Sequence, residues 1–303
     1  MIDKMRGIVV ALPNDKDLAA AIGKGGTESS MNFYNRKADD DTITVLTPSD
    51  LEKKYYAVPE SILLADIVLL STAKVDALLG ETLIAAGMTD KPVILTDEND
   101  VSKFVQGAAV KDFSVIKREA ALDAIRKLGP SESGQRTRID VDSAFNVKGV
   151  GTVLLGIVRS GVVKVHDSMM CSGGGQLSIR SIQSLDVDIE SAVKGIRVGL
   201  AVKGLDSADV EKGDILTDKV VPRVKAIKAK IKLGKLYAEG SIGGEMIGFS
   251  CGFSQCKAKI SELEGDSCAI SFEKAIPVEQ GDKFLLSQDS KPRIFGAGSV
   301  LSA

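Results

Sequence analysis

The sequence predicts an α/β domain followed by two β-barrels, and three observations support this fold class. Short apolar runs alternate with helical segments over residues 1–130. The stretch at residues 129–134 is rich in Gly, Pro and Ser, which is typical of a linker. After it, short strands of alternating polarity recur roughly every ten residues, as they do in β-barrels. We therefore expect three domains, at residues 1–130, 137–220 and 222–303.

The first domain contains apolar runs of the kind that form strands buried on both faces of a parallel sheet. These runs lie at residues 7–11, 42–46, 67–70, 92–95 and 113–116. Helices are expected at residues 17–22, 55–64, 75–86 and 118–128. Asp15 is expected to cap the first helix, Pro59 to lie in the first turn of the second or bend it, and Gly87 to end the third. This alternation predicts a mostly parallel, doubly wound sheet.

The two barrels are predicted from period-two alternation of polar and apolar side chains. In the second domain this alternation is clearest at residues 137–142 and 177–182. In the third domain we expect strands at residues 224–233, 245–250, 257–263, 268–272 and 283–287.

Composition limits the classes of function. The net charge of −2 gives no indication of bulk nucleic-acid binding, although it leaves a local RNA-binding face open. Apolar runs fall short of the ~18 residues that a membrane helix needs, and residues 1–7 lack a signal-peptide core. We expect a cytoplasmic monomer that binds neither membranes nor DNA.

The thiols and the single His suggest no catalysis and no metal site. Cys251 and Cys256 are an odd number of residues apart in an expected strand, so they would point to opposite faces, and no His lies nearby. We expect buried thiols. His166 has no Ser or Cys nucleophile visibly paired with it and is expected at the surface.

Several segments resemble one family in order. The run Asp142-Ser-Ala-Phe-Asn-Val-Lys-Gly-Val-Gly-Thr-Val-Leu-Leu-Gly156 resembles the start of the second domain of translational GTPases, above all of selenocysteine-specific elongation factors. Residues 161–167, 179–183, 195–201 and 210–216 continue the likeness, and residues 278–284 and 293–298 resemble the end of the third domain of elongation factor Tu. The chain looks like an archaeal SelB-like protein, a relative with degenerate GTPase motifs.

The resemblance implies that the first domain is a degenerate P-loop GTPase-like domain, in which three motifs can be located. A P-loop needs Gly residues, a Lys and a Ser or Thr after the first strand. Here Pro13 removes a backbone donor, Asp15 and Asp17 add negative charge, and Lys16 alone is basic. The later run of residues 23–27 is Gly-rich, but its Lys-to-Thr spacing is wrong. It more closely resembles switch I of the family or a flexible loop that ends a helix.

The other two motifs are also broken. The D-x-x-G motif, which positions Mg²⁺ and the γ-phosphate, is replaced by the run from Leu46 to Ser49, and Asp50 stands where the family has its catalytic His. The guanine-reading N-K-x-D motif is replaced by Thr96-Asp97-Glu98-Asn99. With all three motifs lost, we expect no bound nucleotide, no Mg²⁺ and no GTP hydrolysis.

The resemblance also implies a pocket for the amino acid carried by tRNA. By motif, its acidic residue is Asp142 and its Arg is Arg197, while Ser143 replaces a basic neighbour. Loss of one cationic group weakens the prediction that the pocket binds the anionic side chain of selenocysteine. The alternative is that Asp142 caps a turn and pairs with Arg197 only for packing.

A basic cluster begins the third domain, which in the family touches the tRNA stem. Candidate RNA contacts are Arg223, Lys225, Lys228 and Lys230, and Lys232 and Lys235 continue the cluster. A solvated edge strand guarded by Lys residues is the alternative.

These observations predict a SelB-related, elongation factor-like protein that binds tRNA, the ribosome or translation factors without GTP hydrolysis. One alternative is a divergent but active GTP-binding factor that delivers aminoacyl-tRNA, and only this reading needs GTP and Mg²⁺. Another is a protein-interaction scaffold.

Overall fold

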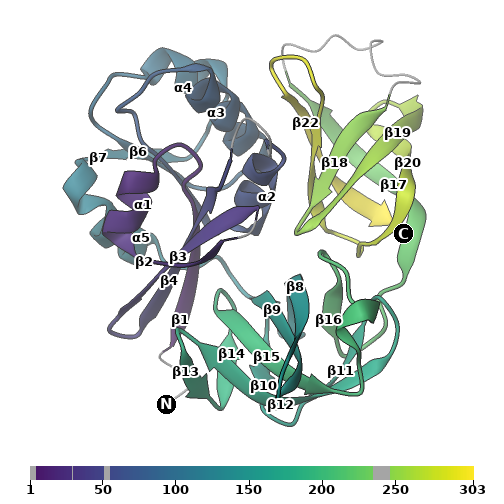
Figure 1. Ribbon diagram of the computed structural model, residues 1–303. Helices are drawn as coiled ribbons and strands as arrows, with labels where there is room; N and C mark the ends of the chain where they lie inside the picture. Colours follow the sequence, from purple (N-terminus) through teal and green to yellow (C-terminus); the bar gives the residue numbers. More distant parts are fainter. Residues whose placement is uncertain (1–4, 29, 51–54, 235–245) are drawn as a thin grey trace.

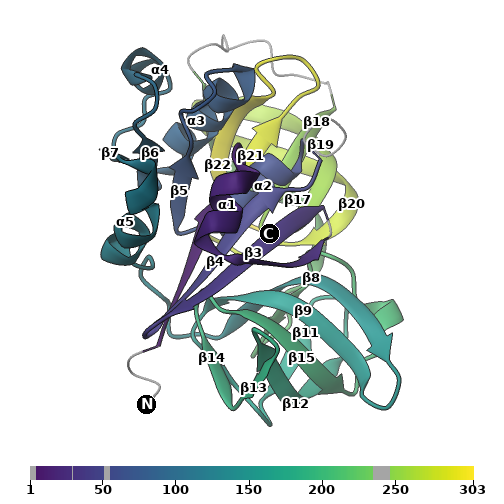
Figure 2. The same cartoon turned by 60° about the vertical axis from the view of Figure 1, so that its left-hand side comes forward.

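The computed structural model describes residues 5–28, 30–50, 55–234 and 246–303. An α/β domain and two β-barrels each contact the other two units around a common centre (Figure 1). In a second view the strands of the α/β sheet cross above the first barrel, while the second barrel lies behind helices α2 and α3 (Figure 2). Within the described residues, no helix is both long enough and apolar enough to cross a membrane.

The α/β domain is built on a seven-stranded mixed sheet in the order β2-β3-β4-β1-β5-β6-β7. Its parallel part contains β4, β1, β5, β6 and β7, while β2 and β3 are antiparallel additions at one edge. The strands are β1 (Arg6–Ala11), β2 (Lys24–Glu28), β3 (Met31–Ala38), β4 (Asp41–Pro48), β5 (Ile67–Leu70), β6 (Val93–Thr96) and β7 (Phe113–Ile116).

Helices cover both faces of this sheet because successive side chains of a strand point to opposite faces. Ile8 and Val10 of β1 pack with α1 (Lys16–Ile22) and α5 (Ala121–Leu128). Val9 and Ala11 pack with α2 (Ala57–Leu64), α3 (Ala77–Thr89) and α4 (Ser102–Gly107). This second core continues into the second barrel through Phe253, Leu285, Ile294 and Ala297.

Two local predictions are wrong in this domain, and one strand was missed. The Gly-rich run of residues 23–27 was interpreted as a segment like switch I or as a loop that ends a helix, and the loop interpretation is wrong, because Lys24–Glu28 is a strand paired with β3. The strand β3 was not predicted, because its second half is mostly polar and half-buried or exposed. Gly87 does not end α3, which continues to Thr89 and stops at Asp90 with φ 53°. The prediction that Asp15 caps α1 is confirmed: its side chain accepts from the Leu18 N–H.

The first barrel closes because β11 pairs with both β12 and β16. Its ring has the order β11-β16-β8-β9-β15-β12, and β13 (Val187–Ile189) extends it. The strands are β8 (Arg138–Val147), β9 (Gly151–Ser160), β11 (Ser168–Cys171), β12 (Gln176–Ser184), β15 (Arg197–Lys203) and β16 (Ile215–Thr217), and a separate ribbon pairs β10 (Val162–Lys164) with β14 (Ser191–Val193).

The second barrel is closed in the order β17-β20-β19-β18-β21-β22. Its strands are β17 (Arg223–Leu233), β18 (Ile247–Cys251), β19 (Ser254–Glu264), β20 (Ser267–Pro277), β21 (Lys283–Ser287) and β22 (Ile294–Ser302). Residue 245, expected to begin a strand, lies outside the described residues. Cys251 and Cys256 do not share a strand as predicted, because a turn at Gly252 and Phe253 separates β18 from β19. Both are free thiols, the first buried and the second half-buried.

Close contacts fix the three units against one another. A Cβ atom on Gly195 would lie 2.1 Å from the carbonyl oxygen of Gly7, so only Gly, here with φ 85°, lets the first barrel approach β1 this closely. Between the α/β domain and the second barrel, Arg293 donates to buried Glu81 at 2.7 Å. Between the barrels, Arg138 donates to Asp282 at 2.6 Å.

Candidate functional site

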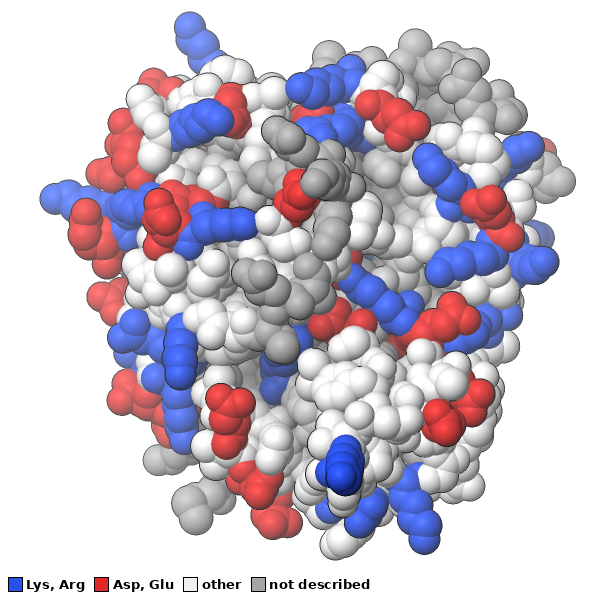
Figure 3. All heavy atoms as spheres, viewed as in Figure 1, with Lys and Arg blue, Asp and Glu red and all other residues white. Residues whose placement is uncertain are grey.

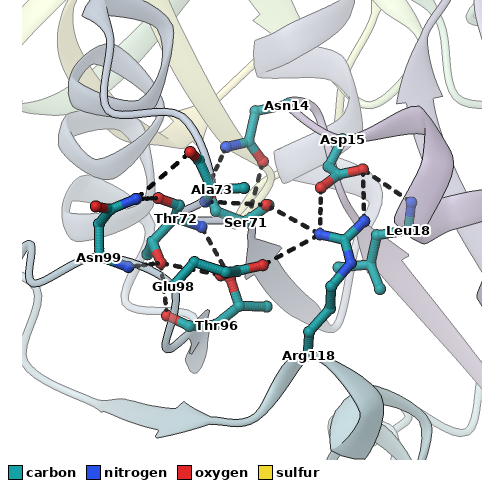
Figure 4. Close-up of polar contacts among 10 residues, drawn as sticks. All are labelled: Asn14, Asp15, Leu18, Ser71, Thr72, Ala73, Thr96, Glu98, Asn99 and Arg118. Carbon is teal, nitrogen blue, oxygen red and sulfur yellow. Dashed lines mark hydrogen bonds and ion pairs between the residues drawn. The ribbon is translucent and has the colours of Figure 1, made fainter.

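The carboxyl edge of the parallel strands is where an open α/β sheet holds its ligands. Here the chain segments that follow β1, β5, β6 and β7 converge on that edge, and they bond to one another (Figure 4). Two of these segments carry degenerate motif positions. The other two, which contain Ser71, Thr72 and Arg118, were not identified from the sequence.

Arg118 binds carboxylates from two of these segments. Its Nη1 and Nη2 donate to the two carboxylate oxygens of Asp15 at 2.6 and 3.1 Å. Nη1 also lies 3.2 Å from Glu98 Oε1 and 3.3 Å from Ser71 Oγ. The Asp15 hydrogen bond is the main cause of the raised pKa of Arg118. Burial acts to raise the pKa of Asp15, but bonds from Arg118 and the Leu18 N–H outweigh it, and the net pKa falls.

Asn99, in the segment that replaces the guanine-reading motif, is hydrogen-bonded to the segment after β5. Asn99 Nδ2 donates to the carbonyl of Thr72 at 2.8 Å, and the Asn99 backbone N–H donates to Thr72 Oγ1 at 3.0 Å. Thr96 Oγ1 accepts from the Thr72 N–H at 2.8 Å. Asn14 exchanges two hydrogen bonds with the Ser71 backbone. The polar groups that could read a base therefore tie β6 to the end of β5.

The remaining degenerate positions are dispersed. Lys16 Nζ donates to the Ser49 carbonyl at 2.8 Å, linking the start of α1 to the segment after β4. Leu46 is part of the core, Pro13 is buried, Asp50 is half-buried, and Asp17 and Asp97 are exposed. In the described parts of the chain, no group of three His, Cys, Asp or Glu side chains could hold a metal ion.

The candidate aminoacyl residues meet at the boundary between the first barrel and the α/β domain. Asp142 lies at a register shift of β8, where an extra residue re-aims a side chain. Arg197 Nη2 lies 3.3 Å from Asp142 Oδ2, and its guanidinium carbon lies 3.2 Å from the centre of the Phe33 ring. Ser143 is half-buried beside Asp142 on β8. The structure thus brings the predicted pair together and adds an aromatic ring from β3.

A second ion pair joins this cluster and was missed by the sequence analysis. Glu60 of α2 is fully buried, with Lys212 Nζ at 2.6 Å and Gln255 Nε2 at 2.9 Å. Lys212 also lies 4.0 Å from Asp142. Burial raises the pKa of Glu60 to about 7, Lys212 opposes this rise, and Asp142 adds to it. Because these residues come from all three units, the cluster marks their common junction.

A cleft of about 460 Å³ opens beside Arg197, between the β2–β3 pair and the edge formed by β12 and β15. Its lining combines Gly residues, polar side chains and aliphatic side chains with three charged residues, including the exposed Lys24. The lining residues are Lys24, Gly25, Gly26, Asn35, Leu155, Gln183, Ser184, Leu185, Asp186, Arg197, Val198 and Gly199.

The candidate RNA contacts fall into two groups. Arg223 is half-buried and pairs with Asp214 at 2.6 Å and Glu211 at 2.8 Å, and its role as an RNA contact stays a prediction. Lys225, Lys228 and Lys230 are exposed, and Lys230 pairs with Asp266. The alternative of an edge strand is wrong, because β17 pairs with both β20 and β22. Lys232 is exposed as well, while Lys235 lies outside the described residues. On the face seen in Figure 3, basic and acidic side chains are interspersed.

Residues 151–217, from β9 to β16, match the family model of elongation factor Tu domain 2. Over 98% of this chain, the structure is similar to elongation factor SelB from Methanococcus maripaludis in complex with a GTP analogue. The TM-score is 0.79 at 20% sequence identity, with 79% of that chain covered. A bacterial selenocysteine-specific elongation factor superposes with a TM-score of 0.80 over 97% of this chain and 58% of its own. The chain has the fold of the selenocysteine-specific elongation factors.

Sequence relatives agree with this fold. The selenocysteine-specific elongation factor of Methanocaldococcus jannaschii is 30% identical over 191 residues, which cover 54% of this chain and 41% of that protein. The uncharacterized protein MJ0325 of the same organism is 27% identical over 310 residues and matches along its whole length. The SelB-like architecture therefore extends over all three units, as the sequence predicted.

Proposed function

We propose that this SelB-like protein binds tRNA or the ribosome as part of the translation machinery and does so without a GTP cycle. The observation that carries the proposal is the ion-pair network of Arg118, Asp15 and Glu98 at the carboxyl edge of the sheet (Figure 4). We further propose that the protein acts in the cytoplasm as a monomer and needs no cofactor.

Electrostatics argues against a nucleotide at this edge. A phosphate needs backbone N–H groups and positive charge, and the segment after β1 offers Pro13 and the carboxylate of Asp15. The single positive charge of Arg118 is already outweighed by the two carboxylates that pair with it. Removing one partner of such a pair leaves the other uncompensated in a partly desolvated place, which is costly. A nucleotide would have to break this network and then face its acidic residues.

The junction of the three units supports a fixed arrangement that needs no γ-phosphate. In switching GTPases, order in the switch segments depends on contacts with the γ-phosphate and Mg²⁺. Here α2 is held by Glu60, whose carboxylate contacts Lys212 of the first barrel and Gln255 of the second. The C-terminal carbonyls of α2 accept from Arg159. These contacts come from the chain itself.

RNA binding rests on the SelB-like architecture and on the exposed Lys residues of β17. Lys228, Lys230 and Lys232 alternate with buried residues, so their side chains share the outer face of the barrel. A row of ammonium groups suits backbone phosphates, which are the main source of affinity in such complexes.

The proposal is tested by measuring the affinity of unfractionated tRNA for the protein by filter binding, with no nucleotide, with GDP–Mg²⁺ and with a GTP analogue–Mg²⁺. We expect the same dissociation constant in all three conditions. The alternative of an active elongation factor predicts tighter binding with the GTP analogue. The same assay is repeated with purified ribosomes. A dissociation constant that changes tenfold between nucleotides, or binding of neither tRNA nor ribosomes, would contradict the proposal.

A further inference from the structure

A polar cavity of about 360 Å³ lies where the three units meet, at the amino-terminal edge of the parallel strands. Its cationic lining residues are Lys91 just before β6, Arg138 and Arg159 of the first barrel, and Lys283 of the second. The network around Arg118 lies at the opposite, carboxyl edge, so the two places are distinct. The volume is far above the roughly 10–15 Å³ that one water molecule needs, so a larger group fits.

The lining of this cavity carries more positive than negative charge. Besides the four cations, its charged residues are the carboxylates Asp140 and Asp282. Both accept from Arg138, at 2.8 and 2.6 Å. Glu279 also lies 3.2 Å from Arg138, but it is shared with Arg136, which does not line the cavity. Arg138 therefore takes up most of the negative charge within reach.

Two of the remaining cations have little to balance them. Arg159 lies 3.5 Å from Asp140, the carboxylate that Arg138 also binds. Lys283 is exposed and takes part in no ion pair within the described ranges of the chain. A further anion in the cavity would therefore be attracted rather than repelled.

Lys91 is the third such cation, and it too forms no ion pair with any residue that the structure describes. Its Nζ donates to the carbonyls of Leu63 and Ala65 at the end of α2, and carbonyls at a helix end carry only partial negative charge. Asp66 acts to raise the pKa of Lys91 but is itself paired with Lys194 at 2.7 Å. Burial outweighs it and lowers the pKa of Lys91 to about 7. An uncompensated buried ammonium is costly, and a bound anion would remove this cost.

We propose that this cavity binds a small phosphate-class oxyanion, such as inorganic phosphate or pyrophosphate, and that the ion links the three units. Two or more negative charges match the excess of cations from the α/β domain and both barrels. The side chains of Arg138 and Arg159 are only 15% and 26% exposed, so a free ion fits better than the phosphate of an RNA strand. The ion is a stabilising ligand, and this inference does not depend on the proposed binding of RNA.

Isothermal titration calorimetry of the full chain with pyrophosphate, in a chloride buffer free of phosphate and Mg²⁺, tests the site. We expect saturable binding. Lys91→Gln and Lys283→Gln should each weaken it at least tenfold, which corresponds to about one charge-assisted hydrogen bond. Lys259→Gln, at an exposed position of β19 in the same barrel as Lys283, is the matched control and should bind like wild type. No saturable binding, or equal affinity in wild type and folded Lys283→Gln, would overturn the proposal and leave RNA binding untouched.

Thermal unfolding separates this site from the general stabilisation that phosphate salts give by exclusion from protein surfaces. At roughly one hundred times its dissociation constant, pyrophosphate should raise the Tm of wild type by about 3–5 °C. The rise should be less than half as large in Lys283→Gln, at the same ionic strength. Equal rises would indicate the general salt effect alone and overturn the site. A loss of tRNA affinity in Lys283→Gln with unchanged pyrophosphate binding would assign this cation to RNA and also contradict the inference.

Discussion

Arg118 follows β7 and binds carboxylates from two other edge segments, Asp15 and Glu98. The sequence analysis identified Asp15 as unsuited to phosphate and named Glu98 within the replaced base-reading motif, and both carboxylates are part of the observed network. It missed Arg118 because the three motifs considered follow other strands. Only the parallel pairing of β6 and β7 brings this Arg to the same edge. Long-range placement of this kind is not encoded in local residue patterns.

Arg118→Ala should lower the free energy of unfolding by about 1–3 kcal/mol, because Asp15 and Glu98 would lose a partly buried partner. Denaturation by urea measures this change. Lys117→Ala, at the exposed neighbouring position, is the control and should stay within about 0.5 kcal/mol. The double variant Asp15→Ala/Arg118→Ala should lose less than the sum of the single losses. Additive losses would mean that the pair contributes no coupling.

Glu60 should make stability depend on pH. Burial raises its folded-state pKa from 4.5 to about 7, so the folded protein binds this proton more tightly than the unfolded chain. Its contribution is therefore full below pH ~4.5 and is lost as the pH rises through 7. The contribution is at most about 3 kcal/mol, since one pKa unit corresponds to ~1.4 kcal/mol.

Urea denaturation of wild type and Glu60→Gln between pH 5 and 8 measures this dependence. Because other carboxylates titrate in both proteins, the relevant quantity is the difference between the two at each pH. We expect wild type to lose stability relative to Glu60→Gln as the pH rises. A difference that does not vary with pH would show that Glu60 keeps an ordinary pKa.

At the scale of elements, the apolar runs predicted every parallel strand. Strands β1, β4, β5 and β6 are almost fully buried and have the strong sequence pattern of strands covered on both faces, whereas the edge strand β7 is mostly exposed, contrary to that expectation. The apolar runs did not predict β3, whose residues from Tyr34 onward are half-buried or exposed. The end of α3 was also predicted wrongly, because Gly87 was interpreted as a helix stop. Gly87 instead allows close packing against the end of α4, since a Cβ atom at this position would lie 2.2 Å from the Ala108 carbonyl oxygen.

Gly87→Ala should therefore destabilise the protein by about 1–3 kcal/mol through overpacking, although Ala favours helices. Gly80 lies in the same helix, and a Cβ atom added there would meet no atom within 4 Å, so Gly80→Ala is the matched control. It should stabilise the protein by about 0.5–1 kcal/mol. Thermal unfolding of both variants measures these changes. Equal effects of the two substitutions would contradict the packing role of Gly87.

The Lys residues of β17 give a prediction for the second barrel. Lys228→Glu with Lys232→Glu should weaken RNA binding and lower its salt dependence, because each phosphate contact contributes nearly one unit to the slope of log K against log salt. Filter binding between 50 and 200 mM KCl, roughly the range over which such effects are large, measures both. Lys37→Glu, on an exposed position of β3, is the control. Equal losses in the control and the β17 variant would exclude a specific role for this face.

At the scale of the whole molecule, the three units meet at charged residues, and one hydrophobic core of the α/β domain also continues into the second barrel. Glu81 and Arg293 join the α/β domain to the second barrel, and Arg138 and Asp282 join the two barrels. The sequence predicted the units and their order, because each has its own pattern of periodicity. It did not predict these junctions, since a charged residue on a strand gives no indication of which unit it will contact.

The central proposal is that the α/β domain of this protein, which has the fold of the selenocysteine-specific elongation factors, binds no guanine nucleotide. Isothermal titration calorimetry of the full chain with GDP and with a GTP analogue, each in excess Mg²⁺, tests it most directly. The occupied edge around Arg118 predicts no saturable heat up to about 1 mM ligand, which corresponds to a binding free energy weaker than about −4 kcal/mol. Saturable binding of either nucleotide with a micromolar dissociation constant would contradict the account.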